Sequence, residues 1–133
     1  MKHLTLLRSA LKVNGFFSLT SAFIALLFGN SVIAVSEMVN HHPLSFAIAL
    51  SLFGLVVLFA GFKKKMSMAL VWTIIVLDFM YVLLGFVSLV LPNNLSTGGF
   101  LLVLGTNVAV LILAVFQTIG IVGYSRSVKK LET

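Results

Sequence analysis

The sequence predicts an all-α protein, a four-helix transmembrane bundle with up-down-up-down topology and both termini in the cytoplasm. Of its 133 residues, 60% are hydrophobic and 9% are charged, whereas a soluble domain carries about 25% charged residues. Four apolar segments are long enough to cross a bilayer. The Lys and Arg residues all lie outside these segments. We therefore expect residues 1–133 to form a single membrane domain.

The first predicted span covers residues 13–35. It follows a basic segment, residues 2–12, in which Leu4, Leu7 and Leu11 have the spacing of one helix face. This segment is either an interfacial turn that leads into the membrane or the first turns of the same helix. The apolar stretch is longer than the hydrophobic region of a secretory signal, so we expect a retained membrane helix.

The other three predicted spans are separated by short connections. The second covers residues 44–62 and follows Pro43, which suits the first turn of a helix. Three lysines join it to the third, residues 66–91, so we expect these two spans to form an antiparallel hairpin. Pro92 and the turn-forming residues after it end the third span. The fourth covers residues 100–124 and precedes a basic tail.

The distribution of charge predicts the orientation. The nine Lys and Arg residues lie in the N-terminal segment, the connection between the second and third spans, and the C-terminal tail, with none in the loops 36–43 and 92–99. The positive-inside rule places these three basic segments in the cytoplasm. The net charge of +6 is thus a membrane feature, and no nucleic-acid partner is expected. The connection is either a topology signal or a contact for anionic lipid headgroups, with the candidates Lys63, Lys64 and Lys65.

One acidic residue, Asp78, lies inside an apolar segment. It shares a face of the third span with Tyr81, and polar faces should point inward because lipid cannot satisfy hydrogen bonds. Counted at about 1.5 Å per residue, several polar side chains of other spans lie at a similar depth. We expect a network in which Asp78 joins Asn107, Gln117 and a serine of the first span, with the candidates Ser18 and Ser21.

Asp78 has two interpretations. In the structural one, a neutral Asp78 donates a hydrogen bond and helps to hold the bundle together. In the functional one, Asp78 exchanges a proton or binds a cation during transport. No Lys, Arg or His lies at its depth, so no cationic partner is expected for it within the chain.

Few residues outside the spans are of types that could bind a metal or take part in catalysis. Glu37, His41 and His42 could bind a metal, but adjacent histidines point in different directions, so a solvated loop is the alternative that we favour. The chain has no cysteine, and no nucleophile–base set can be assembled. We therefore expect no cofactor and no enzymatic activity.

Two stretches carry a resemblance to known proteins. LRSALKVNGFFS (residues 7–18) and DFMY (residues 78–81) resemble parts of small bacterial four-helix membrane proteins of unassigned function, and the size and layout are similar to DoxX-like proteins. This resemblance implies a bacterial inner-membrane protein and no particular activity. In size the chain is also similar to small multidrug resistance exporters, which carry a membrane carboxylate in their first helix. Here the carboxylate is Asp78 in the third span, which departs from that pattern.

The sequence leaves two hypotheses of function. The first is a non-enzymatic protein that associates with itself, with another membrane protein or with lipid, because small or polar residues follow one face in each of the first two spans. These residues are Asn14, Ser18, Ser21 and Ala25, then Ala47, Ser51, Gly54 and Gly61. The second is a small, dimeric transporter that uses Asp78 as a proton or cation site.

Overall fold

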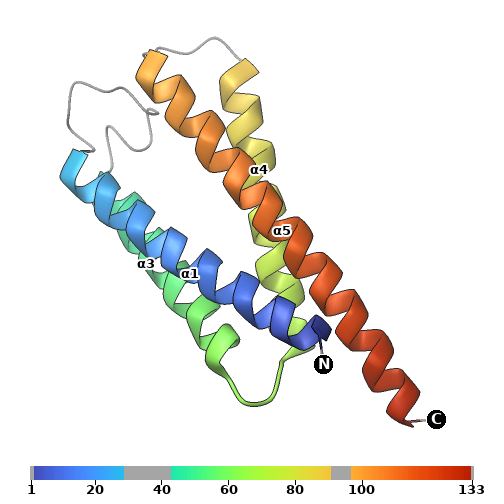
Figure 1. The fold of residues 1–133 in the computed structure, drawn as a ribbon. Helices are drawn as coiled ribbons and strands as arrows, with labels where there is room; N and C mark the ends of the chain where they lie inside the picture. The colour runs from blue at the N-terminus through green and yellow to red at the C-terminus, as the bar shows by residue number, and fades with distance from the viewer. Residues whose placement is uncertain (1, 29–42, 91–96, 133) are drawn as a thin grey trace.

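The computed structural model describes residues 2–28, 43–90 and 97–132 of the chain (Figure 1). These ranges form four helices joined without strands in the described parts: α1 (Lys2–Phe28), α3 (Pro43–Phe62), α4 (Met68–Val90) and α5 (Thr97–Glu132). Each helix is long and apolar enough to cross a membrane. The predicted all-α architecture with four candidate spans is thus confirmed.

The helices pack as two pairs. α1 lies along α3 and α4 lies along α5, and α1 contacts α5 about as extensively as α4 does, which joins the pairs. α3 and α4 follow one another through residues 63–67 but make little contact. The hairpin predicted for residues 44–62 and 66–91 is therefore limited to its connection, because the two helices diverge beyond it (Figure 1).

Two helices differ in extent from the predicted spans. α1 begins at Lys2, so residues 2–12 are the first turns of this helix and not a separate interfacial turn. α5 continues to Glu132, and its 36 residues correspond to about 54 Å at about 1.5 Å per residue. This exceeds the roughly 30 Å of a bilayer core. The basic tail is thus helical and stands beyond the bundle (Figure 1).

Glycines allow α1 and α3 to approach closely. A Cβ atom at Gly54 would lie 3.1 Å from the carbonyl oxygen of Gly15, and one at Gly61 would lie 3.3 Å from the Cβ of Leu11. Without a hydrophobic drive between helices in lipid, such close packing is a main source of helix association. Gly15, Gly54 and Gly61 therefore serve the contact between these two helices.

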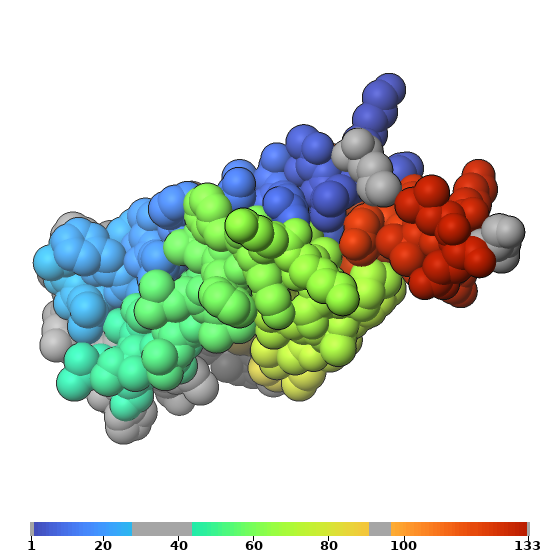
Figure 2. All heavy atoms as spheres, turned by 90° about the horizontal axis from the view of Figure 1, so that it is seen from below, coloured from blue at the N-terminus to red at the C-terminus, as the bar shows by residue number. Residues whose placement is uncertain are grey.

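The three basic segments lie next to one another at one end of the bundle (Figures 1 and 2). There the Arg8 guanidinium donates a hydrogen bond of 2.6 Å to the carbonyl oxygen of Lys64. The Lys12 ammonium lies 4.4 Å from the centre of the Phe62 ring. The lysines of residues 63–65 are exposed, as contact with water or lipid headgroups requires. We refer to this end as the basic end.

A packed core fills the half of the bundle next to the basic end. It draws buried side chains from all four helices and from the connection between α3 and α4. These residues are Leu7, Leu11, Val57, Ala60, Met66, Val71, Ile74, Ile75 and Ile121.

The contact between α1 and α5 provides a first prediction. A Cβ atom at Gly120 would lie 2.8 Å from the Cβ and 3.0 Å from the Cα of Leu7. Because a helix backbone cannot yield as a flexible side chain can, we expect Gly120→Ala to lower the free energy of unfolding by about 1–3 kcal/mol. The matched control is Gly105→Ala on the same helix, where nothing lies within 4 Å. Thermal unfolding in detergent measures both, and equal stability of the two variants would contradict the packing.

Candidate functional site

Asp78 lies near the middle of α4, about 15 Å from its start and about 18 Å from its end at about 1.5 Å per residue. Its side chain is 3% exposed. The carboxyl oxygen Oδ2 accepts a hydrogen bond of 2.7 Å from Nδ2 of Asn14 on α1 and one of 3.3 Å from Nε2 of Gln117 on α5. Three helices therefore meet at this oxygen, and the bond from Asn14 joins the α1/α3 pair to the α4/α5 pair.

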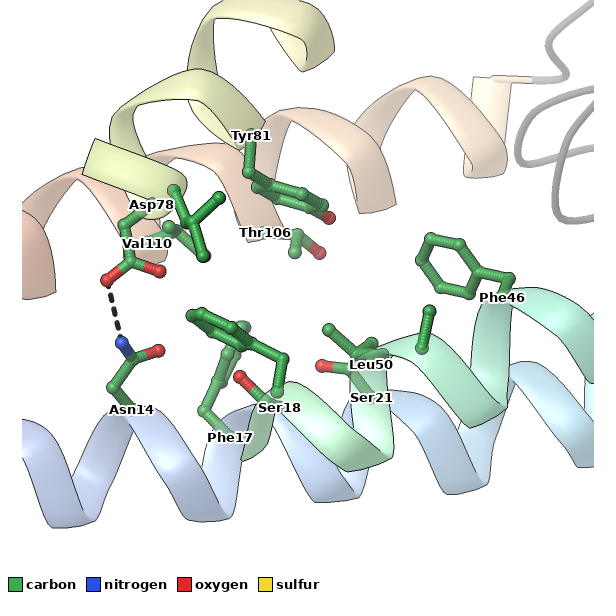
Figure 3. Close-up of a pocket in the computed structure, with 13 residues that line it drawn as sticks. Asn14, Phe17, Ser18, Ser21, Phe46, Leu50, Asp78, Tyr81, Thr106 and Val110 are labelled. Atoms are coloured by element: carbon green, nitrogen blue, oxygen red, sulfur yellow. Dashed lines mark hydrogen bonds between the residues drawn. The ribbon is translucent and has the colours of Figure 1, made fainter. Parts of the chain in front are cut away.

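The two partners of Asp78 are neutral amides. Their hydrogen bonds orient the carboxyl group without balancing its charge, because neither donor carries a positive charge. Both bonds go to Oδ2, and Figure 3 shows the second oxygen directed toward a cavity. The carboxyl group is thus held in place on one side and presented to open space on the other.

That cavity has a volume of about 320 Å³ and is lined by side chains from all four helices. Small-molecule sites range from about 300 to about 1,000 Å³ and are mostly apolar with a few polar groups. This cavity fits the description, since apolar and aromatic side chains form most of its wall (Figure 3). The polar residues in the wall are Asn14, Ser18, Ser21, Asp78, Tyr81 and Thr106.

The layer of Asn14, Asp78 and Gln117 separates the cavity from the packed core. On α1 and α4 the core residues precede this layer in sequence, and on α5 the core residue Ile121 follows it. Ser21 on α1, Tyr81 on α4 and Thr106 on α5 line the cavity from the other side of the layer. The core therefore closes the cavity toward the basic end, and Asp78 lies at its floor.

The cavity reaches the outer surface of the bundle between α3 and α4. Ala49 and Leu50 line it from α3, and Leu77 and Tyr81 line it from α4, although these two helices make little contact. Ala49 is exposed and Leu77 is 45% exposed. In a membrane this side of the cavity borders lipid.

Gln117 is the one residue of the expected network that bonds to Asp78. Ser18 and Ser21 line the cavity, but the hydrogen bond from α1 comes from Asn14, one turn before Ser18. The predicted span began at residue 13 and so placed Asn14 at the membrane edge. Because α1 begins at Lys2, Asn14 lies about 18 Å along the helix. The signal in the sequence that could have identified Asn14 is its spacing from Ser18 and Ser21, which places the three residues on one helix face.

Asn107 lies outside this network. It is 1% exposed. Its amide packs against Gly85 of α4, so closely that a Cβ atom at Gly85 would overlap it. Neither its Nδ2 nor its Oδ1 has a hydrogen-bond partner. Tyr81 is half-buried and lines the cavity one turn beyond Asp78, so it shares the site without a bond to the carboxyl group.

The remaining sequence candidates lie away from the cavity. Lys63, Lys64 and Lys65 are at the basic end, and Glu37, His41 and His42 are outside the described residues. Within the described ranges, no group of three His, Cys, Asp or Glu side chains could hold a metal ion.

No family model, no curated protein and no solved structure matches this chain. The resemblance noted from residues 7–18 and 78–81 is supported at the level of layout, since the chain is a four-helix protein with four candidate membrane spans. The fold therefore defines the class, a multi-pass membrane protein. The cavity beside Asp78 is the feature that bears on its function.

Asn14 and Asn107 provide a matched pair for a second prediction. Both are buried on spans, but Asn14 donates a hydrogen bond and Asn107 has no partner. An interhelical hydrogen bond in a membrane contributes about 0.6 kcal/mol on average and up to about 1.7 kcal/mol. Both variants lose the same atoms, so the difference in stability between them reports the hydrogen bond. We expect Asn14→Ala to be less stable than Asn107→Ala by an amount in this range. Unfolding in mixed micelles measures the difference, and the reverse order would contradict the network.

Proposed function

We propose that this chain is a small, non-enzymatic carrier of the bacterial inner membrane that takes a lipid-soluble molecule into the cavity beside Asp78. The observation that carries the proposal is a buried carboxyl group at the floor of a cavity of about 320 Å³. Polar groups inside a membrane are costly, and they commonly mark substrate or ion pathways. Here the polar group has an open space next to it, which a purely structural hydrogen bond does not need.

The position of the site supports a carrier. Many carriers bind their substrate near the middle of the membrane, at the interface between two halves of the protein. Asp78 is near the middle of α4, and the Asn14–Asp78 bond lies between the two helix pairs. The cavity is closed toward the basic end and borders lipid between α3 and α4. This arrangement gives a ligand access from one side and a barrier on the other.

Association with other chains is the other hypothesis from the sequence, and it rests on the small residues of the first two spans. Of these, Gly54 and Gly61 lie against α1 of the same chain. All four helices of one chain contribute to the cavity wall. The proposal therefore names lipid and a ligand as partners, and it invokes neither a second copy nor nucleic acid.

The chemistry of the cavity supports binding without catalysis. General acid–base or nucleophilic catalysis needs a titratable pair or a nucleophile placed near a base. The hydrogen-bond partners of Asp78 are amides, and Tyr81 is the other titratable side chain of the cavity wall. We also propose that both termini are cytoplasmic, and the three basic segments that lie at one end of the bundle support this orientation through the positive-inside rule.

Filling the cavity tests the proposal. Ala49→Phe adds a ring to the wall, and we expect it to abolish binding of 4-propylphenol, a small ring compound with one hydroxyl donor. The matched control is Ile48→Phe, the neighbouring residue, which is 52% exposed and outside the cavity wall. Native mass spectrometry of protein released from detergent measures the bound fraction.

The result expected is a bound species for the unchanged protein and for Ile48→Phe, and none for Ala49→Phe. Equal occupancy in all three proteins would mean that the probe binds the lipid-facing surface. That outcome, or a lack of binding by the unchanged protein, would overturn the assignment of the cavity as a binding site.

A further inference from the structure

We propose that the ligand of this cavity is a lipophilic monocation, held by the Asp78 carboxylate and by the aromatic rings above it. This inference rests on the proposed carrier function and names the class of its substrate. It follows from three properties of the cavity: the sign of its charge, the side chains of its wall and its access from lipid.

The cavity contains one acidic group and no basic one. The side chains that face Asp78 from the other helices are Asn14 on α1 and Gln117 on α5, and α3 contributes apolar and aromatic residues to the wall. Within the cavity wall, Tyr81 is the other titratable residue. A carboxyl group held away from water is either protonated or paired with an opposite charge. Since the described residues of the wall supply none, a ligand that carries one positive charge completes the site.

Aromatic rings line the cavity that the carboxyl group faces. Phe17 follows Asn14 by three residues and Tyr81 follows Asp78 by three, so each ring lies about one helical turn beyond the hydrogen-bonded layer. Phe46 enters the wall from α3 (Figure 3). The faces of such rings attract cations, most strongly where water is excluded. A carboxylate below and rings on the sides are the features that recognise an organic ammonium group.

The same wall argues against a hydrated metal ion. Calcium and magnesium ions take about six or more oxygen ligands, whereas this wall offers one carboxyl group and a few hydroxyl and amide groups among apolar side chains. An organic cation carries its own apolar body. It can reach the cavity from lipid between α3 and α4, and its body can fill a volume of about 320 Å³.

The charge balance of binding is simple. The cation pairs with the carboxylate, no covalent bond forms, and a proton and the cation compete for the same group. A proton bound to Asp78 leaves to water when the cation binds. Cation binding therefore weakens as the proton concentration rises, whereas binding of a neutral ligand of the same shape does not depend on this exchange.

The test uses two probes of the same shape. Benzyltrimethylammonium is a quaternary cation that cannot donate a hydrogen bond, and neopentylbenzene is its neutral counterpart with carbon in place of nitrogen. Binding of each is measured by equilibrium dialysis on the full chain in nanodiscs, with empty nanodiscs as the reference. We expect the cation to bind the unchanged protein at least about tenfold more tightly than the neutral probe.

Two variants locate the effect. Asp78→Asn should lower the affinity for the cation to that for the neutral probe in the same protein, because the side chain keeps its shape and loses its charge. Phe17→Leu should weaken binding of the cation more than binding of the neutral probe, because it removes a ring and keeps an apolar wall. The comparison of two probes within each protein remains informative when a variant is less stable.

The outcomes separate this inference from the proposed function. Equal affinity of the unchanged protein for both probes would overturn the proposal of a cationic ligand. The cavity would then be a site for a neutral ligand. A cation preference that persists in Asp78→Asn would also overturn the proposal, by placing the preference elsewhere. If 4-propylphenol binds and the cation does not, the proposed ligand class is wrong and the proposed carrier function is retained. If none of the three probes binds, both proposals fall.

Discussion

The requirement that a polar group inside a membrane find its partners within the protein governs this structure. Asp78 meets it by accepting hydrogen bonds from Asn14 and Gln117 at one oxygen. The bond from Asn14 fixes the level at which the α1/α3 pair meets the α4/α5 pair. On one side of that level the four helices pack into a core, and on the other they leave a cavity.

The sequence predicted the features that depend on the solvent. Lipid offers no hydrogen bonds, so four apolar segments had to be helices, and Asp78 had to face the interior. Depth along the helices also placed Gln117 near it. Asn14 was missed because hydropathy marks the apolar part of a helix and not its hydrogen-bonded extent. α1 continues through the basic residues to Lys2, so Asn14 lies near the middle of this helix and next to Asp78.

The sequence did not predict which helices lie side by side. A short connection favoured a hairpin of α3 and α4, yet these helices diverge. In lipid, apolar side chains gain little from contact with each other, so close approach at small residues decides the neighbours. Gly15 and Gly54 bring α1 to α3, Gly120 brings α5 to α1, and Gly85 receives Asn107 from α5. The glycine contacts of the described chain leave α3 and α4 unpaired, and the cavity lies between them.

The cavity wall alone cannot select a ligand. Because the cavity borders lipid between α3 and α4, acyl chains compete for the same space, and an apolar ligand gains little over them. An acyl chain offers nothing, however, to the Asp78 oxygen that faces the cavity (Figure 3). Under the proposed function, selection therefore comes from the carboxyl group, through a charge or a hydrogen-bond donor on the ligand. The hydrogen bonds from Asn14 and Gln117 leave that oxygen facing the cavity, and so the same bonds that link three helices also orient the carboxyl group for the proposed ligand.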